Sequence, residues 1–115
     1  MKRILLCLMV ALFATGCLFA KNNDEKMNVM SYNIRYDNSG DKDNQWKFRR
    51  DFAADLVKFH EADVFGAQEV LNNQLNDLLD RLPEYAYVGV GREDGKTKGE
   101  YAPIFYRKDR FSVEK

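Results

Sequence analysis

Two polar side chains, Asn33 and Glu69, lie near the carboxyl ends of two segments that have the pattern of β-strands. An amide and a carboxylate that meet at one place can hold a hard divalent cation and orient a phosphate oxygen. Mg²⁺ is commonly held by only one or two protein carboxylates, with water and substrate phosphate completing its octahedron. Glu69 alone is therefore a sufficient anchor for such an ion. The same residue types also fit structural roles, in which Glu69 is a solvated strand-end residue or a helix N-terminal charge and Asn33 caps a turn.

Strands and helices alternate along the part of the chain that must position these two residues. Residues 27–36 alternate in polarity as a strand does, and residues 62–70 form a short apolar run typical of a buried strand. Residues 46–60 between them have the periodicity of an amphipathic helix. If the two strands are parallel neighbours joined by that helix, Asn33 and Glu69 lie on one rim of the sheet, where open α/β sheets bind ligands.

The other segments complete an alternating pattern. Residues 37–44 are rich in Asp, Asn and Gly, which predicts a loop that ends in capping residues. Leucines over residues 71–82 predict a second helix, which the proline that follows must stop. Residues 85–90 and 101–106 predict two strands of a hairpin, joined by the loop at 91–100. The apolar side of the first helix is predicted to contain Phe52, Ala53, Leu56, Val57 and Phe59.

The first twenty residues have the pattern of an export signal. Lys2 and Arg3 form a positive start, and an uninterrupted apolar run of eleven residues follows at 4–14. This run is too short to cross a bilayer as a mature helix, which needs about 20 residues. Residues 1–20 therefore predict a signal peptide of an exported protein.

The end of this signal resembles a bacterial lipobox. Residues 14–17 read Ala-Thr-Gly-Cys, which makes Cys17 the expected lipidated first residue of the mature protein. Simple cleavage after Ala20 remains the alternative. The first reading predicts a lipid anchor in the bacterial cell envelope, and the second predicts a periplasmic or secreted protein. In both, residues 21–26 form a short polar tether.

Composition excludes several classes of function. The chain has 115 residues, enough for one small domain, and carries 18 basic and 18 acidic side chains. After residue 20 the count is 16 basic and 18 acidic, so a strongly basic nucleic-acid module is not expected. Of the two cysteines, Cys7 lies in the apolar run of the signal, and Cys17 is either acylated or removed with the signal. The mature part therefore has no thiol for a disulfide, a zinc-thiolate site or a cysteine nucleophile.

Three motifs resemble one family. MNVMSYNIRYDN at 27–38, FGAQEV at 65–70 and GEYAPIFYRKDRF at 99–111 together resemble the endonuclease/exonuclease/phosphatase superfamily, especially secreted members from Bacteroides-like bacteria. The resemblance covers nearly all of residues 27–115. It implies a deoxyribonuclease-I-like α+β fold, a four-layer α/β/β/α sandwich of which this chain supplies the N-terminal half.

The resemblance also implies roles for particular residues. It implies that Asn33 contacts the scissile phosphate or the metal shell and that Glu69 ligates Mg²⁺ or Mn²⁺. Arg35 stands where some branches have Asp, so it replaces a second early ligand and is a candidate phosphate contact. Arg49, near the start of the predicted helix, and Glu100, in the GEY motif, are further candidates for substrate binding. Packing, surface solvation and an edge-strand charge are the alternatives for these two.

Family catalysis also needs a later Asp-x-Asn motif and an Asp-His pair, and nothing after Phe111 supplies them. The resemblance therefore predicts a Mg²⁺-dependent phosphoesterase acting on a phosphate-ester substrate, present here as a truncated N-terminal portion. A non-catalytic exported α/β fragment or an anion-binding module is the alternative. Neither the substrate nor the oligomeric state follows from the sequence.

Overall fold

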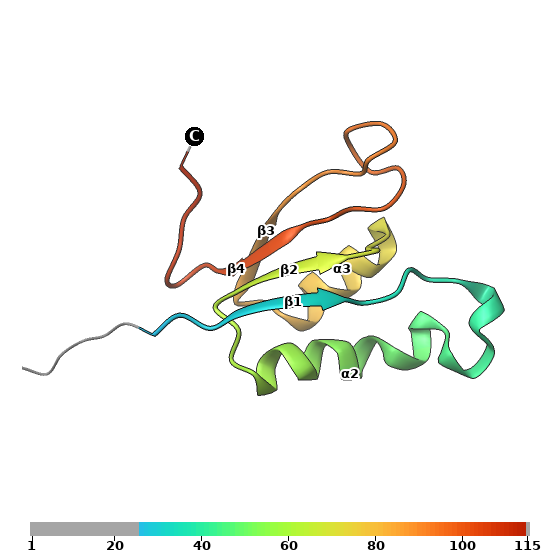
Figure 1. Ribbon diagram of the computed structural model, residues 1–115, viewed down its shortest axis with the longest axis horizontal. Helices are drawn as coiled ribbons and strands as arrows, with labels where there is room; N and C mark the ends of the chain where they lie inside the picture. Colours follow the sequence, from blue (N-terminus) through green and yellow to red (C-terminus); the bar gives the residue numbers. More distant parts are fainter. Residues whose placement is uncertain (1–25, 115) are drawn as a thin grey trace, which may run out of the picture.

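The computed structural model describes residues 26–114, which form one four-stranded sheet and two α-helices (Figure 1). The predicted signal peptide, Cys17 and residues 21–25 of the predicted tether lie outside the described residues. The elements in chain order are β1 (Val29–Asn33), the 3₁₀ helix η1 (Ser39–Asn44), α2 (Trp46–Phe59), β2 (Val64–Gln68), α3 (Asn72–Arg81), β3 (Tyr85–Val88) and β4 (Ile104–Arg107). The predicted α+β class is confirmed.

The sheet has the order β1-β2-β4-β3. β1 and β2 are parallel and are joined through α2, as predicted, with Asn33 opposite Gln68 at the end of the register. β3 and β4 pair antiparallel, which confirms the predicted hairpin, and β4 also pairs antiparallel with β2. The predicted bounds were too wide at the connection, because β3 ends at Val88 and β4 begins at Ile104, while Tyr101 forms only an isolated bridge with Val70. The parallel pairing brings the carboxyl ends of β1 and β2 to the same rim (Figure 1).

Both α-helices pack on one face of the sheet. The core cluster joins Ala53 and Val57 of α2 and Leu78 of α3 to Phe65 and Phe105 of the central strands. Strand alternation directs Met30 and Tyr32 of β1 toward this core and leaves the other face of β1, including Asn33, exposed. The sheet face that carries Asn33 is therefore not covered by either helix.

The predicted loop at 37–44 is partly wrong, because Ser39–Asn44 forms a 3₁₀ helix with a break at Lys42. The side chain of Asn38 caps it by accepting a hydrogen bond of 2.9 Å from Gly40 N. The predicted capping at the end of this loop is wrong, because Gln45, the residue before α2, makes no side-chain cap hydrogen bond. The side-chain cap lies at the start of the segment instead, where Asn38 precedes the short helix.

The predicted apolar face of α2 also needs correction. Ala53 and Val57 are buried as expected, but Phe52 and Phe59 are exposed on the opposite side of the helix, and Trp46 is buried instead. At 100° per residue, Trp46, Ala53 and Val57 share one side, while Phe52 and Phe59 share the other with Phe48.

Within residues 26–114 no helix combines the length and apolar character that a membrane crossing requires.

Candidate phosphate and metal site

The two strands that carry the site both end in an uncommon backbone conformation. Arg35, two residues after Asn33, has φ 60°, and Glu69, directly after β2, has φ 58°. A positive φ is uncommon for residues other than glycine and costs free energy that the surrounding structure must offset. Both strands therefore stop at the rim, and the chain turns there instead of continuing the sheet.

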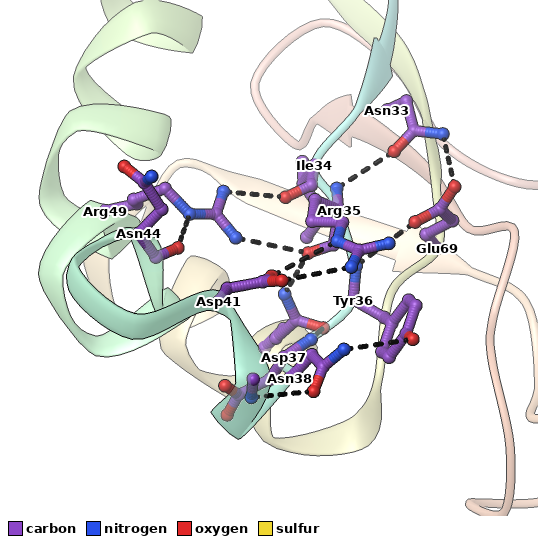
Figure 2. A network of polar contacts seen from close by, with 12 residues as sticks. Asn33, Ile34, Arg35, Tyr36, Asp37, Asn38, Asp41, Asn44, Arg49 and Glu69 are labelled. Carbon is purple, nitrogen blue, oxygen red and sulfur yellow. Dashed lines mark hydrogen bonds and ion pairs between the residues drawn. The ribbon is translucent and has the colours of Figure 1, made fainter.

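Asn33 and Glu69 meet directly at this rim. Asn33 Nδ2 donates a hydrogen bond of 2.9 Å to Glu69 Oε1 (Figure 2). Asn33 Oδ1 accepts one of 2.9 Å from Arg35 N. The backbone N–H must find an acceptor and the carboxylate must find a donor, so these two partners fix which way the Asn33 amide faces. The predicted juxtaposition of Asn33 and Glu69 is confirmed.

The second oxygen of Glu69 contacts the backbone. Glu69 Oε2 accepts a hydrogen bond of 3.3 Å from Tyr36 N (Figure 2). The hydrogen bond from Asn33, that from Tyr36 N–H and the nearby Arg35 charge together lower the pKa of the Glu69 carboxyl. Glu69 is thus a carboxylate at neutral pH, with one partner on each oxygen and further lone pairs free for a cation.

A buried amide supports the turn behind these residues. Gln74 of α3 is 0% exposed, and its Oε1 accepts hydrogen bonds from Asp37 N at 3.0 Å and Leu71 N at 3.1 Å. Its Nε2 donates to the Arg35 carbonyl at 2.8 Å. Gln74 therefore ties the turn that contains Tyr36 N to the start of α3. Gln74 was not among the predicted site residues, although a Gln three residues after a helix N-cap is a known capping signal.

Of the two candidate arginines, Arg35 belongs to this turn and Arg49 reaches its backbone from α2 (Figure 2). The Arg35 guanidinium binds both carboxylate oxygens of Asp41, at 3.1 and 3.0 Å, which raises the pKa of Arg35 and lowers that of Asp41. Arg49 donates to the carbonyl oxygens of Asn44 at 2.6 Å and Ile34 at 2.9 Å. Arg49 therefore holds the backbone after β1 against the start of α2.

A cavity of about 530 Å³ joins the rim to the loop before β4. Asn33 and Glu69 line it together with Glu100 and Arg92. Arg92 Nη1 lies 3.1 Å from Glu100 Oε2. The structure thus brings the candidate Glu100 into the same cavity as Asn33 and Glu69. Arg92 was not singled out from the sequence, because nothing in the loop composition shows that this basic residue returns to the rim.

The residues present fit a magnesium ion with few protein ligands. Within residues 26–114 no group of three or more His, Cys, Asp or Glu side chains is placed to hold a metal. Glu69 is a hard oxygen donor that stays ionised, and Glu100 is a second carboxylate in the same cavity. One or two carboxylates with water and phosphate oxygens are a usual environment for Mg²⁺.

Several solved structures are similar to this chain in both fold and sequence. An endonuclease/exonuclease/phosphatase from Bacteroides vulgatus has 55% identity and a TM-score of 0.73, over 74% of this chain and 33% of that one. A family protein from Bacteroides thetaiotaomicron has 44% identity and a TM-score of 0.75, over 77% and 34%. A mannosyl-6-phosphatase from the same organism has 43% identity and a TM-score of 0.76, over 78% and 34%.

The fold and these likenesses define the class of protein. The chain belongs to the endonuclease/exonuclease/phosphatase family and has part of the deoxyribonuclease-I-like fold, as the motifs predicted. It spans about a third of the length of the structures that it matches. A scan against protein-family models and a search of curated proteins each gave no match.

Proposed function

We propose that this chain carries the first part of the active site of a metal-dependent phosphoesterase. The observation that carries the proposal is the pairing of Asn33 with an ionised Glu69 in an open cavity. The structural relatives of the chain include a phosphatase. Glu69 is the proposed ligand of Mg²⁺ or Mn²⁺. A bound ion would polarise a phosphate oxygen and the attacking water. This chain spans only about a third of the length of its structural relatives. Hydrolysis is therefore proposed for a protein with the complete domain and not for this chain alone.

The chain's own residues have distinct proposed roles. Asn33 Nδ2 carries two hydrogens, of which one binds Glu69 and the second is available to a phosphate oxygen. Its fixed orientation means that the donor needs no rearrangement when the phosphate arrives. Arg35 and Arg49 are proposed to attract the phosphate from beside the turn. Glu100 is proposed to contact the substrate within the cavity that Asn33 and Glu69 also line.

A sugar phosphate is the proposed substrate class. One structural relative is a mannosyl-6-phosphatase. The cavity volume of about 530 Å³ is in the range of small-molecule sites. Residues 21–115 have two more acidic than basic side chains, which does not favour a polyanion such as DNA.

Titration of the full chain with MgCl₂ and MnCl₂ tests the metal site. We expect Glu69→Gln to abolish measurable binding, because it removes the anionic ligand and leaves the shape almost unchanged. Glu84→Gln is the matched control, since Glu84 is exposed and does not line the cavity. Equal Mg²⁺ affinity of the wild-type and Glu69→Gln chains would refute the assignment. Metal-dependent hydrolysis of a phosphomonoester or phosphodiester, lost in Glu69→Ala, would extend it to catalysis.

A non-catalytic anion-binding module is the second candidate. The coverage of only a third of the matched structures favours it for the isolated chain. It predicts Mg²⁺-dependent binding of inorganic phosphate with no turnover of any ester. Turnover by the folded chain would exclude it.

We further propose export and lipid anchoring through Cys17. The expected outcome is incorporation of labelled palmitate into the wild-type chain and into Cys7→Ser, but not into Cys17→Ser. Cys7→Ser is the matched control because it changes the other cysteine of the same signal. Labelling of Cys17→Ser would contradict the anchor and favour simple secretion after Ala20.

A further inference from the structure

The outer face of α2 carries three exposed phenylalanines. Phe48 is 62% exposed, Phe52 69% and Phe59 80%. Spacings of four and seven residues place them on one stripe of the helix, opposite the buried side that packs on the sheet. An exposed row of large apolar side chains is unusual on a soluble surface and marks an interaction site. We propose that this stripe, Phe48-Phe52-Phe59, lies on a phospholipid surface, an inference that rests on the proposed lipid anchor at Cys17.

The position of the N-terminal segment supports a membrane as the partner. Met27, Asn28 and His60 line one hollow, so the chain enters the fold beside the C-terminal end of α2, next to Phe59. From the proposed lipidated Cys17 to Lys26 there are nine residues, which reach at most about 30 Å when extended. α2 is 14 residues long, or about 21 Å. An anchor at Cys17 therefore keeps the whole stripe within reach of the bilayer.

The charges beside the stripe fit an anionic surface. Asp55 lies 3.5 Å from Lys58 Nζ, and Asp51 lies 2.5 Å from Arg81 Nε. The two acidic side chains of α2 are thus paired with bases, while Lys47 lies over the Phe48 ring, 4.8 Å from its centroid. A basic residue beside exposed aromatic rings is typical of helices that lie in a membrane interface.

The anchor and the stripe act together. One acyl chain gives only marginal membrane binding, and a second contact makes the attachment stable. The tether raises the local concentration of the stripe at the bilayer, so a modest intrinsic affinity suffices. Asn33 lies on the sheet face that the helices leave uncovered, so contact through α2 turns the proposed site toward water.

Tryptophan reporters in the full chain test this orientation. Phe52→Trp and Phe59→Trp place a fluorophore on the stripe, and Ile104→Trp is the control on the uncovered sheet face, where Ile104 is also exposed. Trp46 is buried, and its emission in the wild-type chain gives the background. The probe is vesicles of phosphatidylethanolamine and phosphatidylglycerol that contain dibrominated acyl chains. The N-terminal segment is the same in all three variants, so a difference in quenching between the positions reports which face contacts lipid.

We expect at least about twofold stronger quenching at positions 52 and 59 than at 104, with a blue shift only when vesicles are present. Phe48→Ser combined with each stripe reporter is expected to reduce that quenching. Equal quenching at all three positions would overturn the orientation. No quenching at any position would overturn the membrane contact. A blue shift in the emission of Phe52→Trp without vesicles would overturn the membrane contact and indicate that a second copy of the chain covers the stripe.

Discussion

Asn33 Nδ2 donates a 2.9 Å hydrogen bond to Glu69 Oε1 although the two residues are 36 positions apart in the chain. The bond crosses from the end of β1 to the end of β2, the two parallel strands of the sheet. It joins an oriented amide to an anionic oxygen at the place where the strands stop. The pair is therefore a consequence of parallel strand pairing and of the turns that end both strands.

The first prediction concerns the titration of Glu69. Its pKa is lowered by the hydrogen bonds from Asn33 and Tyr36 N–H and by the Arg35 charge. Asn33→Leu is expected to raise this pKa toward the ordinary glutamate value of about 4.3, as followed by carbon NMR of the carboxyl group. Asn76→Leu, the same substitution at an exposed site, is the control. An unchanged pKa in Asn33→Leu would show that the amide does not stabilise the carboxylate.

The lowered pKa of Glu69 also determines how its contribution to the free energy of unfolding changes with pH. Because the folded-state pKa of Glu69 is depressed, its contribution to stability is present above the ordinary glutamate pKa. It is lost as the pH falls through the lower folded-state value. Metal binding at Glu69 is expected to weaken over that same acidic range, because protons compete for the carboxylate.

The second prediction concerns the backbone at Glu69. At φ 58°, a β-branched side chain is strained and glycine is not. Glu69→Val is expected to have a free energy of unfolding about 1–3 kcal/mol lower than Glu69→Gly, measured by urea denaturation. The same two substitutions at Glu84, which has no positive φ, should not show this order. Equal stability of the two Glu69 variants would contradict the left-handed conformation.

The third prediction concerns Gln74. Gln74→Leu removes the acceptor of the partly buried N–H groups of Asp37 and Leu71. It also leaves the Arg35 carbonyl with only the 3.5 Å hydrogen bond from Arg49 Nη2. The expected loss in the free energy of unfolding is about 2–3 kcal/mol, again from urea denaturation. Asn76→Leu in the same helix is the matched control because Asn76 is exposed. A loss in Gln74→Leu no larger than in the control would show that the turn does not depend on this amide.

The fourth prediction compares an aromatic ring in the buried core with an exposed ring on the outer face of α2. Phe105 is 0% exposed and stacks on Phe65, with 4.5 Å between ring centroids. Phe105→Ala is expected to lower the free energy of unfolding by about 3–5 kcal/mol. Phe52→Ser, on the exposed side of α2, is expected to change it by about 0.5 kcal/mol or less without vesicles. A large loss in Phe52→Ser would mean that this ring is packed within the fold.

The sequence alone determined the order of strands and helices and the rim that holds Asn33 and Glu69. Both follow from local pattern: alternation with period two marks β1, helical periodicity marks α2, and a helical connection makes β1 and β2 parallel. The three motifs added the family, which the solved structures confirm.

Tertiary structure decided what depends on contacts between distant segments. The left-handed turns at Arg35 and Glu69, the burial of Gln74 and the return of Arg92 to the rim have no periodic signal in the chain. The side of α2 that faces the sheet was also decided there, because apolar residues occur on both sides of the helix. Packing buries Trp46, Ala53 and Val57 against the strands, and the phenylalanines remain outside because one helix can bury only one side against one sheet.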